Sequence, residues 1–226
     1  MGHPQQGTGG YVPAQVADCE GRCAVKLAKQ IVFVVDDDVA IREALASLIG
    51  SVALRVECFA SPGEFLRRRR SESPSCLVLD VRMPGLSGLD LQRKLARAEQ
   101  EIPIIFISAH GDIPMAVRAM KAGAIEFLPK PFREEELLDA IRQALARDEA
   151  AKARRTEVTK IRNRHAKLTA RQHQIMTLIV AGKLSKQIAA KLGLSENTIK
   201  VHRRRIMERM GATSVAELVH MIGRLT

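Results

Sequence analysis

Residues 31–38 read IVFVVDDD, an apolar run that ends in three consecutive carboxylates. A second apolar run, CLVLD at 76–80, ends in one carboxylate, Asp80. Short apolar runs bounded by polar residues are typical of strands that are buried on both faces of a parallel sheet. Each run therefore predicts a buried strand with acidic side chains at its carboxyl end.

Three further apolar runs follow the same pattern, at 52–59, 104–107 and 125–128. Stretches with helical spacing separate the runs, and a helix with an acidic start follows the last one and runs on through Leu145. Five strand–helix repeats predict a doubly wound, flavodoxin-like (βα)5 domain of the α/β class, with the strand order 2-1-3-4-5.

In that order the first and third strands are neighbours, and ligands bind outside their carboxyl ends. Asp36, Asp37 and Asp80 therefore converge on one crevice, where Mg²⁺ would relieve their mutual repulsion. Ser108 and Lys130 follow the fourth and fifth runs and belong to the same edge. Acids, a metal ion, a hydroxyl and an ammonium around one crevice predict a site for a phosphoryl group.

Helix starts are marked by capping residues. Asp38 is expected to cap the helix after the first strand, and capping boxes are expected at Ser61-x-x-Glu64, Thr169-x-x-Gln172 and Ser214-x-x-Glu217. Ser185 and Ser195 are expected to be N-caps.

The net charge of +11 lies in the last third of the chain. Residues 31–147 carry 16 basic and 17 acidic side chains, whereas residues 148–226 carry 17 and 6. A basic module joined to a nearly neutral one indicates a polyanionic partner. Caps and glycines in the basic part predict an all-α arrangement of four short helices, at about 169–181, 185–192, 195–210 and 214–223.

The second and third of these helices are separated by the tripeptide LGL at 192–194, which predicts a helix-turn-helix. The third helix would bury one stripe of side chains, formed by Ile199, Ile206 and Met210. It would present another face, formed by Lys200, Val201, Arg204 and Glu208. Lys and Arg reach guanine and Val contacts the thymine methyl in the DNA major groove.

Residues 30–147 resemble the receiver domain of two-component response regulators. The resemblance rests on VDDD at 35–38, LDVRMPG at 79–85, SA at 108–109, GA at 123–124 and KPF at 130–132.

The resemblance implies that Asp80 accepts a phosphoryl group from a sensor histidine kinase. It implies Mg²⁺ held by Asp37, Asp80 and the Arg82 carbonyl, with Asp36 assisting. It further implies Ser108 as the switch hydroxyl, Lys130 as the ion-pair partner of the phosphate and Phe127 as a rotating aromatic. The peptide bond between Lys130 and Pro131 is expected to be cis.

The segments LTAR at 168–171, KQIA at 186–189 and LSENTIKVH at 194–202 resemble the LuxR-type DNA-binding domain. The resemblance implies base contacts by Lys200, Val201 and Arg204, and phosphate contacts by Lys186, Thr198, Arg203 and Arg205. The last helix would supply a dimer surface. Residues 110–124 look most like the FixJ branch of the FixJ/NarL type, which includes regulators of nitrogen fixation and nodulation.

Together these features predict a disordered leader at 1–29, a receiver domain at 30–147, a helical linker at 148–166 and a LuxR-type domain at 167–226. We expect a cytoplasmic transcriptional regulator, most simply an activator, that is not an enzyme. Its expected partners are double-stranded DNA, the sensor kinase, RNA polymerase and, once phosphorylated, a second copy of itself. No apolar run is long enough to span a membrane.

Two other functions are compatible with parts of the sequence. A Mg²⁺-dependent phosphohydrolase could use Asp80 as its nucleophile, although such enzymes typically carry Asp-x-Asp where this chain has Asp80-Val81-Arg82. Alternatively, the receiver could be unresponsive to phosphate and the protein could bind DNA constitutively. Cys19 and Cys23 have the spacing of a weak metal motif, and free thiols are the simpler interpretation.

Overall fold

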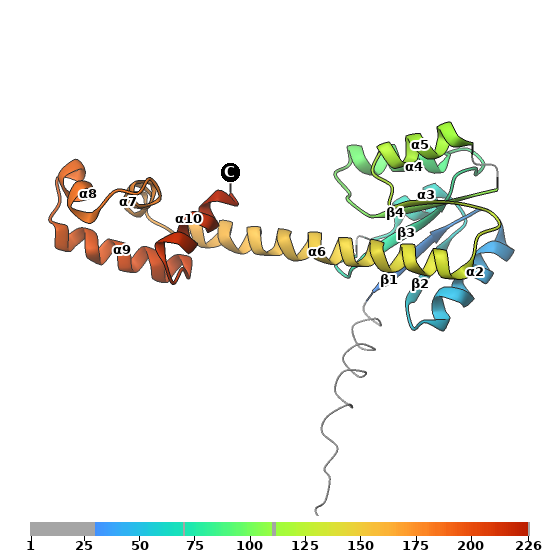
Figure 1. Cartoon of the computed structure of the whole chain (residues 1–226), viewed down its shortest axis with the longest axis horizontal. Helices are drawn as coiled ribbons and strands as arrows, with labels where there is room; N and C mark the ends of the chain where they lie inside the picture. Colours follow the sequence, from blue (N-terminus) through green and yellow to red (C-terminus); the bar gives the residue numbers. More distant parts are fainter. Residues whose placement is uncertain (1–29, 70, 110–111, 226) are drawn as a thin grey trace, which may run out of the picture. The chain divides into compact units, whose positions relative to one another are not determined.

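The computed structural model of the protein describes residues 30–69, 71–109 and 112–225 (Figure 1). The chain divides after Glu149 into two compact units. The leader expected at 1–29, with Cys19 and Cys23, lies outside the described residues. None of the described helices combines the length and the apolar character that a membrane span requires.

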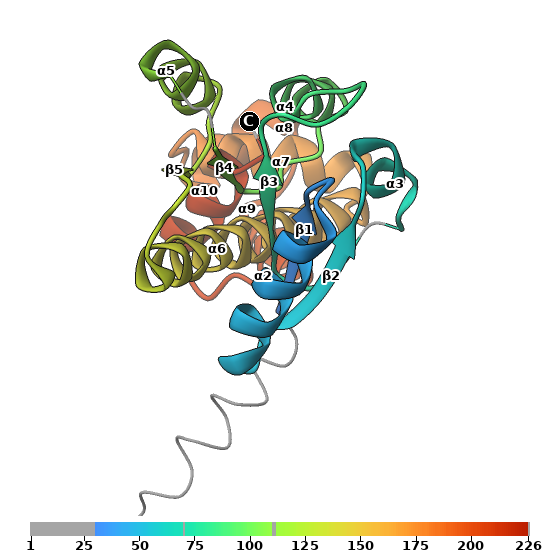
Figure 2. The same cartoon turned by 90° about the vertical axis from the view of Figure 1, so that its right-hand side faces the viewer.

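The N-terminal unit is built on one parallel sheet in the order β2-β1-β3-β4-β5, which confirms the predicted topology. Its strands are β1 (Ile31–Val35), β2 (Arg55–Phe59), β3 (Ser75–Asp80), β4 (Ile104–Ser108) and β5 (Glu126–Pro129). The helices are α2 (Val39–Ser51), α3 (Pro62–Arg67), α4 (Gly88–Arg97), α5 (Ile113–Lys121) and the first part of α6 (Glu134–Ala166). Figure 2 shows α2 and α6 on one face of the sheet and α3, α4 and α5 on the other.

Successive strand residues alternate between two apolar cores, because side chains along a strand point to opposite faces. In β1, Val32 and Val34 pack with Leu45 of α2 and Ile141 of α6. Phe33, between them, packs on the other face with residues of α3 and α4. Both faces of the sheet are therefore covered, which explains why β1 and β3 are apolar without interruption.

The second strand is shorter than the predicted run at 52–59. Helix α2 continues to Ser51 because Ile49 in its last turn is fully buried. The chain then reverses through Ala53, whose φ is 61°, before β2 begins at Arg55.

Helix α6 runs on through Leu145, as the sequence pattern predicted, and continues without a break through the expected helical linker to Ala166. The segment contains neither Gly nor Pro, so nothing interrupts the helical hydrogen bonds. Asp148, buried and 2% exposed, accepts a hydrogen bond from the backbone N–H of Ser75 at 2.7 Å. This bond fastens α6 to the start of β3, beyond the last apolar contact of Leu145.

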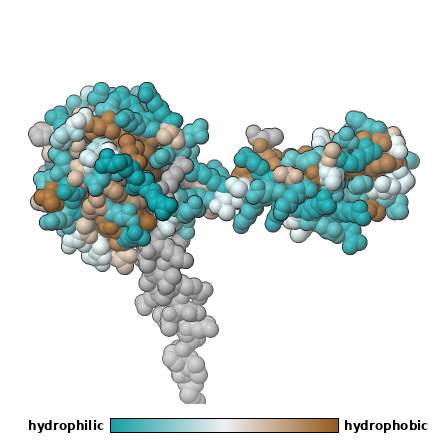
Figure 3. All heavy atoms as spheres, turned by 180° about the vertical axis from the view of Figure 1, so that it is seen from behind, coloured by the Kyte–Doolittle hydropathy of each residue, from teal (hydrophilic) through white to brown (hydrophobic). Residues whose placement is uncertain are grey.

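The C-terminal unit contains the end of α6 and four short helices, and its visible surface is mostly hydrophilic in Figure 3. The helices are α7 (Ala170–Val180), α8 (Ser185–Leu192), α9 (Glu196–Met210) and α10 (Val215–Gly223), close to the predicted ranges. Ile161 of α6 lies in their common core. Arg164 of α6 donates to the Met210 carbonyl at the end of α9 at 3.0 Å, so the last turns of α6 are part of this unit.

Most predicted caps form. Asp38 accepts from the N–H groups of Ala40 and Ile41, and Thr169 and Gln172 make a complete capping box. Glu64 and Glu217 close onto the N–H of the residue before the N-cap, Ala60 and Thr213 respectively, so those two boxes are incomplete. Ser185 is not an N-cap: Leu184 takes that position, and Gln187 accepts its N–H, so Ser185 lies in the first turn.

Gly88, at the start of α4, lies against the backbone at the end of β3. A Cβ at this position would lie 2.3 Å from the Asp80 carbonyl oxygen. Gly88→Ala should therefore lower the free energy of unfolding by about 1–3 kcal/mol, measured by chemical denaturation followed by circular dichroism.

Gly50, in the last turn of α2, is the matched control because a Cβ there has no neighbour within 4 Å. Gly50→Ala should be neutral or stabilising by up to about 1 kcal/mol. Equal losses for the two variants would contradict the close approach of α4 to β3.

Candidate functional site

Two carboxylates meet at the carboxyl ends of β1 and β3. The strands pair in parallel with Val35 opposite Leu79, so Asp36 and Asp80 are neighbours directly beyond that pair. Both residues are buried, with 1% and 6% of their surface exposed. Burial of two like charges is costly unless a cation accompanies them.

Lys130 supplies that cation. Its Nζ lies 2.8 Å from Asp36 Oδ2 and 3.0 Å from Asp80 Oδ1. Lys130 follows β5, and its N–H donates to the Ser108 carbonyl at 2.8 Å, so the end of β4 positions it. The bond to Pro131 is cis, as the resemblance implied.

The other carboxylate oxygens accept backbone hydrogen bonds. Asp36 Oδ1 accepts from the N–H of Asp38 at 2.9 Å, and Asp80 Oδ2 accepts from the N–H of Arg82 at 2.7 Å. These bonds hold both carboxylates in their orientation.

Burial raises the pKa of the Asp80 carboxyl above its ordinary value, while the hydrogen bond and charge of Lys130 act in the opposite direction. Burial by itself would lower the pKa of Lys130, but its hydrogen bonds to Asp36 and Asp80 outweigh that effect and raise the pKa. Lys130 is therefore a fixed positive charge. One ammonium against two carboxylates leaves a site that favours additional positive charge.

The resemblance to receiver domains implies Mg²⁺, and the donor set here has the appropriate chemistry. In the part of the chain that the structure describes, no three His, Cys, Asp or Glu side chains are grouped so as to hold a metal. Mg²⁺, however, is usually bound by one or two carboxylates and keeps several waters. Asp37 is exposed next to the buried pair, and Asp36 and Asp80 offer oxygen ligands only, so the residues fit the ion.

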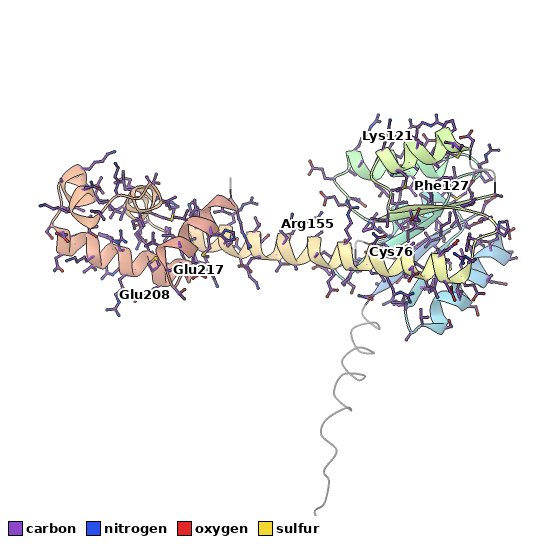
Figure 4. All side chains as sticks on the ribbon, in the orientation of Figure 1. Cys76, Lys121, Phe127, Arg155, Glu208 and Glu217 are labelled. Atoms are coloured by element: carbon purple, nitrogen blue, oxygen red, sulfur yellow. The ribbon has the colours of Figure 1, made fainter. Side chains whose placement is uncertain are left out.

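Ser108 and Phe127 lie on the adjacent strands β4 and β5. Ser108 ends β4 and is 1% exposed. Phe127 of β5 (Figure 4) is partly buried. The centroid of its ring lies 6.3 Å from that of Phe106. The structure thus brings Asp36, Asp80, Ser108 and Lys130 to one edge of the sheet.

Sequence reasoning missed Arg42, which holds the acidic loop from α2. Its Nη1 donates to the carbonyls of Asp36 and Asp37, at 2.7 and 3.0 Å. The available signal was a basic residue one turn into the helix that follows the acidic run, where its side chain can reach back to the loop.

The basic face of α9 is exposed as predicted from its spacing. Ile199, Ile206 and Met210 are buried in the C-terminal core. Lys200, Val201 and Arg204 are exposed, Val201 by 44%. Lys186, at the start of α8, and Arg205 are also exposed, whereas Thr198 and Arg203 are half-buried.

Two glutamates of α9, which the sequence argument did not use as partners, pair with its cations. Glu196 lies 3.2 Å from Lys200 Nζ, and Glu208 lies 2.8 Å from Arg204 Nε, both at a spacing of four residues. The signal was the i, i+4 spacing of opposite charges, which stabilises helices modestly.

Comparison with known families accounts for both units. The response regulator receiver domain matches residues 32–142, and the luxR family of bacterial regulatory proteins matches residues 166–222. The response regulator protein TmoT of Ectopseudomonas mendocina is 48% identical over 91% of this chain and 93% of its own length. The chain is a response regulator. It belongs to the FixJ/NarL type, in which a receiver domain precedes a LuxR-type DNA-binding domain.

Two further relatives of this response regulator cover most of both chains. Nodulation protein W of Bradyrhizobium diazoefficiens is 49% identical over 85% of each chain. The solved structure of the response regulator StyR is 49% identical, covers 86% of this chain and 98% of its own, and superposes with a TM-score of 0.79. Relatives of this type are transcriptional regulators of two-component systems, so a sensor kinase and DNA are implied as partners of this regulator.

Lys130→Gln should raise the pKa of Asp80 further, because it removes the hydrogen bond and the charge that oppose burial. The pKa is measured by ¹³C NMR titration of the labelled carboxyl group. Lys121→Gln, which removes an exposed ammonium at the end of α5 (Figure 4), is the control and should leave it unchanged. An unchanged or lower Asp80 pKa in Lys130→Gln would contradict the role assigned to the ion pair.

Proposed function

We propose that Asp80 is the residue that accepts the phosphoryl group from the sensor histidine kinase. The observation that carries this proposal is the pairing of two buried carboxylates with the single ammonium of Lys130. A phosphoryl group on Asp80 adds negative oxygens, and Lys130 is in place to neutralise them. Ser108 provides a hydroxyl on the adjacent strand.

Asp36, Asp37, Asp80 and the Arg82 carbonyl would hold Mg²⁺, which supplies positive charge to the oxygens of the transferring group. Arg42 keeps the backbone of Asp36 and Asp37 in place for this purpose. The contribution of the protein is thus mainly positioning and charge, which is what phosphoryl transfer requires.

Phosphorylation would draw Ser108 toward the phosphate and let Phe127 turn inward, which remodels the face of α5 and β5. That face contains exposed apolar side chains on one side of α5: Ile113 is 81% exposed, Val117 43% and Met120 41%. Burial of such a stripe against a second copy would stabilise a homodimer.

The two C-terminal units of the dimer would then bind two half-sites on DNA. Lys200, Val201 and Arg204 of α9 would contact bases in the major groove. The residues assigned to phosphates are Lys186, Thr198, Arg203 and Arg205.

We further propose that the receiver comprises 30–147, the linker 148–166 and the DNA-binding domain 167–226. We also propose that the protein acts in the cytoplasm on RNA polymerase as an activator.

The proposed function leaves no role for turnover of external substrates. A phosphohydrolase of the alternative kind would need a second acid two residues after its nucleophile, and Arg82 occupies that position. Hydrolysis of an unrelated phosphate ester would revive the alternative.

Asp80→Asn should abolish phosphate uptake, because the amide cannot act as the nucleophile. Each chain is incubated with acetyl phosphate and Mg²⁺, and phosphate is detected by intact mass and dimerisation by sedimentation. Asp139→Asn, which changes an exposed carboxylate of α6, is the matched control and should behave as wild type. Uptake and dimerisation of Asp80→Asn at the wild-type level would refute the assignment.

Lys200→Ala and Arg204→Ala should each weaken binding to a selected duplex by about 1–3 kcal/mol and relax specificity at particular base pairs. Lys186→Ala should weaken binding to all sequences alike and flatten the salt dependence by about one unit. The measurement is fluorescence anisotropy with the selected duplex and single-base variants of it. A uniform loss in all three variants would contradict the base-reading assignment.

A further inference from the structure

The charge of the C-terminal unit is not concentrated in the helices of the DNA-binding fold. Residues 150–167, most of which form the end of α6, carry seven basic side chains and one acidic. Residues 168–226 carry ten basic and three acidic side chains over a much longer stretch. Residues 143–165 lie between the two family matches, so neither family accounts for this density of positive charge.

One face of α6 is buried in the first part of the helix and carries basic residues further along. Ile141, Leu145 and Asp148 are buried against the sheet at spacings of four and three residues. The same alternating spacing continues to Lys152, Arg155, Thr159 and Arg162. We call Lys152, Arg155 and Arg162 the linker ridge. Arg155 and Arg162 are exposed and Lys152 is half-buried, and Figure 4 shows Arg155 projecting from α6.

The linker ridge lies outside the side of α6 that packs in the C-terminal core. Ile161, which is 1% exposed, defines the packed side, and Arg155 and Arg162 are about 120° and 100° from it at 100° per residue. Arg164 does not fall at the spacing of the ridge, and its guanidinium donates to the Met210 carbonyl. The ridge is therefore a surface of the same compact unit that contains α9.

The charge of the ridge selects its partner. A helix that pairs with its own copy along such a face needs apolar residues at the alternating positions. Here three of the four positions are cationic and the fourth is Thr159, so a parallel pair of copies would place like charges opposite each other. The one acidic residue of the segment, Glu157, does not belong to the ridge positions. A polyanion fits this face, and a second copy does not.

We propose that the linker ridge is a second DNA-contacting surface, which binds phosphates of the duplex next to the site read by α9. The proposal rests on the proposed DNA-binding function and extends it beyond the four short helices. Arg and Lys contacts to phosphate position a protein on DNA without reading sequence. Arg164 and Ile161 fasten the ridge to the unit of the recognition helix, which keeps the ridge with α9 when that helix binds.

The test uses the full chain and a fluorescent random-sequence duplex of about 40 base pairs, between about 50 and 200 mM salt. Arg155→Gln/Arg162→Gln should reduce the slope of log K against log salt by about two units, because each phosphate contact contributes about 0.9. Affinity at the lower salt concentration should fall on the order of 10-fold. Arg155→Lys/Arg162→Lys keeps the charges and should retain the wild-type slope.

Arg154→Gln/Lys160→Gln is the matched control, because it removes two exposed charges from other sides of the same helix. It should leave the slope within about half a unit of wild type. An equal loss of slope in this control would refute the linker ridge as a specific DNA contact and would indicate only an effect of total charge.

Other outcomes separate the ridge from the proposed function. If Lys186→Ala loses slope and the ridge variant does not, the ridge is refuted while DNA binding stands. If the wild-type chain shows no salt-dependent binding to duplex, the DNA-binding function itself fails. A ridge variant that sediments with weakened self-association and keeps its DNA slope would assign the ridge to a second copy, which overturns the proposal.

Discussion

The ammonium of Lys130 between the carboxylates of Asp36 and Asp80 is the interaction on which the N-terminal unit depends. It joins residues from three strand ends, at β1, β3 and β5, and makes the burial of two like charges possible. The ammonium is fully shared, so any group bonded to Asp80 must compete with Asp36 for it. A change in charge at Asp80 therefore alters the ion pair between Asp36 and Lys130 at the end of β5 as well as Asp80 itself.

Helix α6 imposes the second constraint. Its first part is fastened to the start of β3 by Asp148, and its last turns share a core with the four short helices through Ile161. The boundary between the two units therefore falls within a helix and not within a loop. Each unit includes part of α6 in its own packing, so neither can be described without it.

The sequence was sufficient for the sheet order, the acidic edge and the exposed face of α9, because each depends on a repeated pattern of apolar and polar residues. It was not sufficient for the contacts of Lys130, Arg42 and Asp148, which join residues far apart in the chain or use backbone atoms that the pattern does not display. The prediction that Ser185 is the N-cap of α8 was wrong for a related reason. Gln187 closes the first turn on Leu184, so the serine that resembles a cap is not needed as one.

The glutamate pairs of α9 make its reading face electrically balanced. Glu196 and Glu208 match Lys200 and Arg204 one to one, so this face exerts little attraction on a distant phosphate chain. Exposed ion pairs of this kind are weak, so in the proposed complex a guanine edge would replace the glutamate once the helix is in the groove. In the proposed function, capture and discrimination would therefore be divided between different surfaces: the other exposed cations of the unit would draw the protein to DNA, and α9 would read the sequence.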